Sequence, residues 1–175
     1  LVLQLLDVSR MENTGLHYNK EEVDSKSFIL DTTELLSHIS PNHQLITTLC
    51  DSVPVMIDKL RMEQVFSNLL GNAAKYSKSD TTIHIRSTLN NDGFMEVAII
   101  DQGIGMSASS IKSIFKKFYR DKDVIKTHAG LGMGLYVSSK IVVDHGGKIW
   151  VESAQGTGST FFFTIPTINQ GLKAS

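Results

Sequence analysis

The strongest pattern along the chain is the helical spacing of apolar residues at its centre. Apolar side chains recur every three or four positions at Leu60, Val65, Leu69, Leu70 and Ala73. This spacing predicts a helix over residues 58–76 with one buried face. A similar period over residues 133–145, followed by a glycine pair typical of a helix end, predicts a second long helix.

Other segments carry the patterns of strands and shorter helices. The predicted strands are residues 26–30, 45–49, 55–57, 82–89, 96–100, 148–153 and 159–166. The predicted shorter helices are residues 32–39 and 108–118, and a hairpin turn is expected at residues 155–158. Because strands and helices do not alternate regularly, we predict an α+β fold. It would be a two-layer sandwich of a mixed, mostly antiparallel sheet with helices packed on one face.

The beginning of the chain predicts the end of a helix that belongs to a larger unit. Leu1, Leu5 and Val8 share one helical face, and the chain opens on leucine rather than methionine, as a piece of a longer protein would. We expect a truncated helix, a polar linker, a main domain and a tail over residues 1–18, 19–26, 27–167 and 168–175.

Composition and charge argue against several classes of function. The 175 residues are 41% apolar and 20% charged, which is typical of one globular domain. The formal net charge of −1 gives no basic excess for binding nucleic acid. No apolar run approaches the roughly 20 residues of a membrane-spanning helix. A single cysteine, Cys50, cannot form an internal disulfide, so we expect a reducing compartment, the cytoplasm.

Polar residues interrupt the apolar pattern of the central helix. Asn68 and Asn72 are four residues apart, so both amides project from one helical face, beside Lys75. An amide oxygen is a hard ligand suited to Mg²⁺, and a lysine can meet the charge of a phosphate. An isolated asparagine pair usually lies on a solvated face, but the apolar neighbours of this pair favour the wall of a pocket.

Two glycine-containing segments point to a nucleotide. Asp101 ends an apolar strand before Gly103 and Gly105, so its carboxylate faces a tight loop and can accept a hydrogen bond from the exocyclic amine of adenine. Gly132 and Gly134 precede a helix, where exposed backbone N–H groups and the helix dipole form an anion site. Neither segment has the spacing of a Rossmann or P-loop motif.

These segments, together with a pair of phenylalanines, occur in the order of a known family. The sequence resembles the catalytic domain of sensor histidine kinases, which belongs with DNA gyrase, MutL and a heat-shock chaperone to the Bergerat-fold superfamily. The segments that resemble its N, G1, F and G2 boxes are residues 68–76, 101–105, 115–118 and 130–134. The resemblance implies a Bergerat fold with an ATP lid at residues 121–129, and binding of ATP and Mg²⁺.

The resemblance implies a role for each matching residue. Asn72 would coordinate the Mg²⁺ that bridges the ATP phosphates, with Asn68 and Lys75 as further catalytic residues. Asp101 would hydrogen-bond the adenine amine, and Arg120 is a candidate contact of the γ-phosphate. The other nucleotide-binding residues would be Tyr76, Gly103, Ile104, Gly105, Phe115, Phe118, Gly130, Leu131, Gly132, Gly134, Leu135 and Thr160.

The resemblance also implies phosphoryl transfer rather than hydrolysis of ATP. Superfamily members that hydrolyse ATP carry a glutamate at the position of Asn68, and asparagine is not a useful base at neutral pH. Kinases of the family phosphorylate a histidine that precedes an acidic residue and, a few positions on, a proline. None of the six histidines has that setting. The acceptor is therefore expected on a helical hairpin upstream, of which residues 1–18 would be the end.

Further expectations concern partners, and alternatives remain open at this point. A response regulator would receive the phosphoryl group, and the full-length protein would be a homodimer, whereas this fragment could be a monomer. One alternative is a serine kinase acting on an anti-anti-sigma factor, against which the helical start of the chain argues. Another is a module that senses or binds ATP without transferring it, against which the intact asparagine and glycine motifs argue.

Overall fold

The computed structural model describes residues 17–121 and 131–168. Its helices are α2 (Ser25–Leu36), α3 (Lys59–Tyr76), α4 (Ala108–Ile111) and α6 (Gly134–Asp144), with a 3₁₀ turn η1 (Ser37–Ile39). Its strands are β1 (Glu21–Asp24), β2 (Gln44–Thr48), β3 (Pro54–Ile57), β4 (Thr82–Leu89), β5 (Phe94–Asp101), β6 (Ile149–Ala154) and β7 (Gly158–Pro166). The described helices include none that is both long and apolar enough to cross a membrane.

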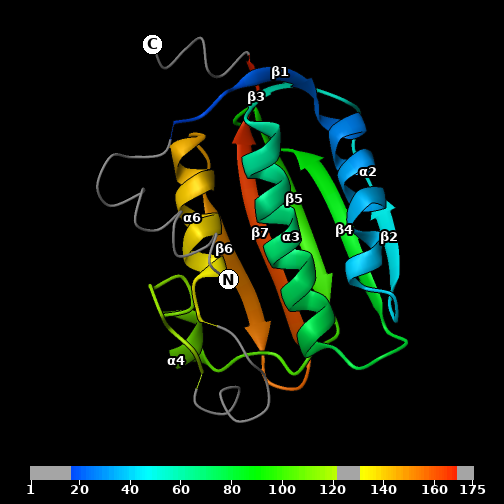
Figure 1. The fold of residues 1–175 in the computed structure, drawn as a ribbon, viewed down its shortest axis with the longest axis vertical. Coiled ribbons are helices and arrows are strands. Elements are labelled where there is room, and N and C mark those ends of the chain that lie inside the picture. The colour runs from blue at the N-terminus through cyan, green and yellow to red at the C-terminus, as the bar shows by residue number, and fades with distance from the viewer. Residues whose placement is uncertain (1–16, 122–130, 169–175) are drawn as a thin grey trace.

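The elements form two layers, as the sequence predicts. One layer is a five-stranded sheet with the order β2-β4-β5-β7-β6, and α2, α3 and α6 cover one of its faces (Figure 1). Only β2 and β4 pair in parallel, and the other neighbouring strands of this sheet are antiparallel. The predicted α+β sandwich with a mixed, mostly antiparallel sheet is therefore confirmed. A separate antiparallel pair joins β1 and β3.

The core lies between α3 and the sheet. The buried face of α3 includes Phe66 and Leu69, and neither residue is exposed at all. The Phe66 ring meets Phe28 of α2 and Phe163 of β7 edge-on, with centroids 5.9 and 5.4 Å away. Edge-to-face contacts of this kind add to the burial of apolar surface. Phe66 therefore ties α3 to both a neighbouring helix and the centre of the sheet.

The prediction of a strand at residues 26–30 is wrong, because α2 already begins at Ser25. Asp24 caps this helix, and its carboxylate accepts a hydrogen bond from the Ser27 N–H at 2.8 Å. The strand of this region is β1, which lies within the segment expected to be a linker. The predicted helix at residues 32–39 is the second half of α2 with η1. The division into domains itself stays a prediction, and residues 1–16 lie outside the described part of the chain.

The predicted helix at residues 108–118 is wrong in length, because α4 ends at Ile111. Phe118 has a φ of 60°, a left-handed conformation that cannot continue an α-helix. The residues between them form a series of turns. This compact segment leads the chain back toward the sheet edge rather than away along a helix axis.

The N-terminal end of α3 and the C-terminal end of α6 are joined by a buried histidine. The ring of His145 is only 3% exposed, and its Nε2 accepts a hydrogen bond from the Asp58 N–H at 3.0 Å. Its Nδ1 lies 2.7 Å from the carbonyl oxygen of Ile141, which can only accept, so Nδ1 carries the proton. His145 is thus held as a neutral imidazole.

The segment that leads into β1 attaches to the same place. Tyr18 donates from its hydroxyl to the Asp144 carboxylate at 2.8 Å, and its ring meets His145 edge-on with a centroid distance of 4.9 Å. The Asn19 N–H donates to the Asp58 carboxylate at 2.9 Å. Lys20 donates to the Asp144 carbonyl at 2.8 Å. We call this cluster the far-end junction; its members are Tyr18, Asn19, Lys20, Asp58, Asp144 and His145.

Candidate functional site

A cavity of about 250 Å³ opens at the opposite end of α3 and α6 from the far-end junction. The predicted site residues that line it are Asn68, Asn72, Lys75, Tyr76, Asp101, Ile104, Gly105, Arg120, Leu131, Gly132, Gly134 and Leu135. Residues that were not predicted also line it: Met106, Ser110, Ile114, Tyr119, Asp121, Met133, Ser159 and Phe161. Segments far apart in the sequence therefore meet here, as the motifs predict.

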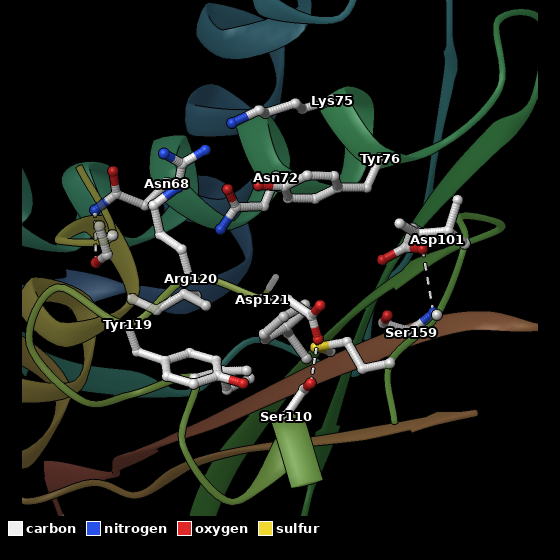
Figure 2. A pocket seen from close by; sticks show the side chains of 18 of the residues that line it. Asn68, Asn72, Lys75, Tyr76, Asp101, Ser110, Tyr119, Arg120, Asp121 and Ser159 are labelled. Carbon is white, nitrogen blue, oxygen red and sulfur yellow. Dashed lines mark hydrogen bonds between the residues drawn. The ribbon is translucent and has the colours of Figure 1, made fainter. Parts of the chain in front are cut away.

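The α3 wall of the cavity carries amide and cationic side chains. Asn68 and Asn72 lie one helical turn apart and both line the cavity (Figure 2). The Asn68 Nδ2 donates to the Gly134 carbonyl at 3.3 Å and to the Ser138 hydroxyl at 3.2 Å, which joins α3 to the first turn of α6. The Lys75 ammonium lies over the Tyr76 ring, 5.0 Å from its centroid. Cationic and neutral oxygen-bearing groups thus share one wall.

Asp101 lies at the end of β5, on the Tyr76 side of the cavity and across from Asn68 and Arg120 (Figure 2). Its side chain is buried, and Oδ1 accepts hydrogen bonds from the Gly103 N–H at 2.8 Å and the Ser159 N–H at 3.1 Å. Burial raises the pKa of Asp101 above its ordinary value, and the two backbone hydrogen bonds oppose this rise. Because both bonds use Oδ1, the second oxygen, Oδ2, is the one oriented for a ligand.

The glycines after Asp101 are required by contacts within the protein. Gly105 has a φ of +67°, and a Cβ there would lie 1.9 Å from the Ala154 carbonyl oxygen. A Cβ on Gly103 would lie 2.7 Å from the Asp101 Oδ1 and 2.8 Å from the Tyr76 carbonyl oxygen. The structure shows that these glycines let the loop lie against α3 and the β6–β7 hairpin, which holds Asp101 in place.

The remaining wall is formed by the residues on either side of the undescribed segment. A side-chain hydrogen bond from Ser110 of α4 to Asp121 ties α4 to this wall (Figure 2). Arg120, the candidate contact of the γ-phosphate, lines the cavity. Gly132 lies against the Tyr119 backbone, since a Cβ there would be 2.5 Å from the Tyr119 carbonyl oxygen.

Some predicted residues are not part of the cavity wall. Thr160 faces the other side of the sheet, because its neighbours on β7, Ser159 and Phe161, line the cavity and successive strand residues alternate. Phe115 packs against the core, and Phe118 is 57% exposed. Gly103 does not line the cavity, but its N–H donates to Asp101 Oδ1. Gly130 and the predicted lid at residues 121–129, apart from Asp121, lie outside the described residues.

Of the residues that were missed, Ile114 and Met133 belong to the hydrophobic core and Tyr119 packs against it, and the other five fall into two groups. The two-residue period of the last strand places Ser159 and Phe161 together on the face opposite Thr160, so the choice of Thr160 for the site excluded both. Met106, Ser110 and Asp121 carry no motif of their own. They reach the cavity because α4 and the loop before it pack against β6, where the Met106 N–H donates to the Ser153 hydroxyl at 2.9 Å, and because Ser110 bonds Asp121.

Comparison with known proteins agrees with this geometry. Residues 57–169 match the family described as histidine kinase-, DNA gyrase B-, and HSP90-like ATPase. The sensor protein kinase WalK of Staphylococcus saprophyticus is 36% identical over 178 residues, 95% of this chain and 28% of WalK. The chain thus spans less than a third of that relative.

Solved structures share the fold. The mycobacterial sensor histidine kinase MprB superposes with a TM-score of 0.74 at 26% identity, over 85% of this chain and 97% of that chain. Full-length ShkA in complex with AMPPNP superposes with a TM-score of 0.83 at 21% identity, over 95% of this chain and 35% of that chain.

The family match covers more than half of the chain and includes the segments that build the cavity. The chain therefore belongs to the histidine kinase-, DNA gyrase B-, and HSP90-like ATPase family, as an ATP-binding catalytic domain of the sensor histidine kinase type.

Proposed function

We propose that this chain binds Mg²⁺-ATP and transfers the γ-phosphoryl group to a histidine on a helical hairpin outside the chain. The observation that carries the proposal is the polarity of the cavity. Amide and cationic side chains, Asn72, Lys75 and Arg120, line it, and the buried Asp101 carboxylate lies across from Asn68 and Arg120 (Figure 2). ATP is complementary to this arrangement. Its anionic phosphates at one end match the amide and cationic side chains, and its exocyclic amine at the other end matches the carboxylate.

The residues present fit Mg²⁺ at the phosphate end. Asn68 and Asn72 offer neutral amide oxygens one helical turn apart on the cavity wall, and such hard oxygens suit this ion. Asn72 would hold the ion, with Asn68 beside it. When bound, Mg²⁺ would neutralise phosphate charge. Lys75 and Arg120 would hold the phosphate oxygens, and Asp101 would accept from the adenine amine through Oδ2.

The side chains along the phosphate end favour transfer over hydrolysis. The amide of Asn68 cannot take a proton from water at neutral pH, so that side chain supplies no general base. Transfer to a nucleophile that is placed in line with the γ-phosphate needs positioning and charge stabilisation instead. Both ring nitrogens of His145 are already hydrogen-bonded in the far-end junction, so this histidine is not available as an acceptor.

The partners follow from this reaction. The acceptor hairpin of the same kinase would supply the histidine, and a response regulator would take the phosphoryl group from it. We propose a homodimer for the full-length protein and a cytoplasmic location for this domain. Relatives named sensor protein kinases support this proposal.

The test combines the chain with its cognate hairpin as a separate polypeptide and labelled ATP. Slow formation of acid-labile, base-stable phosphate on the hairpin is expected, because the covalent tether is lost. Asn72→Ala should lower the rate by about a hundredfold or more, since the ion's contribution is lost. Ser67→Ala, on the same helix but outside the cavity, is the control.

Other outcomes would separate the alternatives. Acid-stable phosphate would indicate a hydroxyl acceptor, as in a serine kinase. ATP binding with no transfer to the hairpin would indicate a nucleotide-sensing module. Phosphate on the isolated chain at a stoichiometry near one would contradict the proposal that the acceptor lies outside it.

A further inference from the structure

The side-chain amide of Asn68 is oriented by α6. Its Nδ2 donates to the Gly134 carbonyl at 3.3 Å and to the Ser138 hydroxyl at 3.2 Å. In the described part of the chain, both of its side-chain hydrogen bonds use this nitrogen. An amide nitrogen has two hydrogens, so the two acceptors together use its full donor capacity.

These contacts fix which way the amide faces. A carbonyl oxygen can only accept a hydrogen bond, so Nδ2 rather than Oδ1 must bond the Gly134 carbonyl oxygen. The Ser138 hydroxyl accepts from the second hydrogen. The Asn68 oxygen takes no part in these two bonds. It lies near Gly134, since a Cβ there would be 3.3 Å from it, and both residues line the cavity, so this oxygen remains an acceptor for a ligand there.

Ser138 itself is outside the cavity wall. It lies one turn after Gly134 on α6 and is 0% exposed. A buried hydroxyl is unfavourable unless it is hydrogen-bonded. Its neighbour Ser139 is partly exposed, and no contact joins it to Asn68 among the described residues. The two serines on one helix therefore have different environments.

We propose that Ser138 is a positioning residue for the metal-nucleotide site. It holds the Asn68 amide with nitrogen toward α6, which leaves the oxygen for the cation that accompanies the ATP phosphates. Without the Ser138 hydroxyl only the 3.3 Å bond to the Gly134 carbonyl still orients the amide, so the amide is held less firmly, and whenever it rotates it presents N–H groups to a cation. This inference rests on the proposed binding of Mg²⁺-ATP.

The test compares Ser138→Ala with Ser139→Ala and with the parent chain. Calorimetry measures the affinity for ATP in excess Mg²⁺ and in excess chelator, and the ratio of the two affinities is the readout. We expect Ser138→Ala to lower this ratio roughly tenfold, as the loss of a group that orients a metal ligand does. The affinity for metal-free ATP should stay unchanged, and Ser139→Ala should behave as the parent.

A second readout does not involve the metal. In the nucleotide-free protein, the side-chain NH₂ protons of Asn68, assigned by their loss in Asn68→Ala, should exchange slowly. Ser138→Ala should make that exchange faster, and Ser139→Ala should not. If Ser138→Ala does not fold, Ser138→Cys leaves no cavity, carries a weaker acceptor and has the same expectations.

The results distinguish failure of this inference from failure of the proposed function. A parent chain that binds ATP equally well with and without Mg²⁺ would overturn the metal site itself, and the inference with it. A Mg²⁺-dependent parent with an unchanged ratio in Ser138→Ala would overturn only the role of Ser138. Equal weakening with and without Mg²⁺ would show that Ser138 supports the fold rather than the amide.

Discussion

At the scale of single residues, Asp101 shows how backbone contacts decide what a side chain offers to a ligand. The N–H groups of Gly103 and Ser159 both donate to Oδ1, so any side chain at this position must present an acceptor to them. A carboxylate has a second acceptor left for the ligand. The amide of an asparagine would have only its NH₂ donor left, which suits a base that presents an acceptor rather than an amine.

Asp101→Asn should therefore weaken ATP binding by about tenfold to a hundredfold. The Asn oxygen would be taken by the two backbone donors, and its NH₂ group would face the adenine amine, a donor against a donor. A mispaired buried polar group costs about 1–3 kcal/mol. Calorimetry with ATP and GTP measures the effect. The preference for ATP over GTP should shrink in the variant, and an unchanged affinity for ATP would contradict the assignment of Asp101 to adenine.

At the scale of elements, the loop after β5 depends on close packing against the β6–β7 hairpin. Gly105 and Gly156 both have a positive φ, of +67° and +80°. A Cβ on Gly105 would overlap the Ala154 carbonyl oxygen, whereas a Cβ on Gly156 would meet nothing within 4 Å. A substitution at Gly156 therefore introduces backbone strain alone, whereas a substitution at Gly105 introduces backbone strain and steric overlap together.

Gly105→Ala should destabilise the protein more than Gly156→Ala. Both variants place a side chain on a left-handed backbone, which costs about 1–2 kcal/mol. Only Gly105→Ala adds an overlap that forces the loop from the hairpin, so its loss should exceed about 3 kcal/mol. Urea unfolding of both variants measures the difference. Equal losses would show that the hairpin moves aside without cost.

The same scale shows which elements could be predicted from the sequence. The predicted bounds of α3, β4 and α6 lie within a residue of those observed, because long apolar periods and glycine stops leave little choice. The start of α2 was misread as a strand, since its buried face includes Thr32 and Thr33 beside Phe28 and Ile29. Threonine counts as polar when apolar residues are used to find a helical period, so the buried face of this helix was not recognised.

The site could be predicted only where its residues belong to motifs. Asn72 and Asp101 are found from local patterns, because each is framed by apolar neighbours or glycines. Ser110 and Ser138 do not belong to a local sequence pattern of this kind. Their positions beside Asp121 and Asn68 depend on how α4 and α6 pack, which is a property of the tertiary structure.

At the scale of the whole molecule, α6 is joined to α3 near both of its ends. Asn68 joins them at the cavity, and the Asp58–His145 hydrogen bond joins them at the far-end junction. Burial lowers the pKa of His145 below its ordinary value of 6.5. The hydrogen bond to Ile141 and the charges of Asp58 and Asp144 oppose this, while Lys20 adds to it.

The far-end junction should make stability depend on pH. The unfolded chain binds a proton on His145 below its ordinary pKa, whereas the folded chain resists it, so stability falls as pH falls from 6.5 toward the lowered value. The contribution is up to about 1.4 kcal/mol for each pH unit in that window. Urea unfolding at about pH 7.5 and about pH 5.5 measures it. His145→Gln should reduce the pH dependence, and His38→Gln, at an exposed position, should not.

The position at which the N-terminal segment enters the domain also limits which histidines can reach the phosphate end of the cavity. Asn19 is bonded to Asp58, and Asn72 lies fourteen residues further along α3 (72 − 58), a span of about 21 Å. An extended chain covers at most about 3.6 Å per residue, so a tether of six or more residues is needed to bridge that span. His17 directly precedes the anchored Tyr18, so it is held at the wrong end of the domain. An acceptor upstream on the same polypeptide must therefore lie at least about six residues ahead of Asn19, and an upstream acceptor closer than that can be phosphorylated only by a neighbouring molecule.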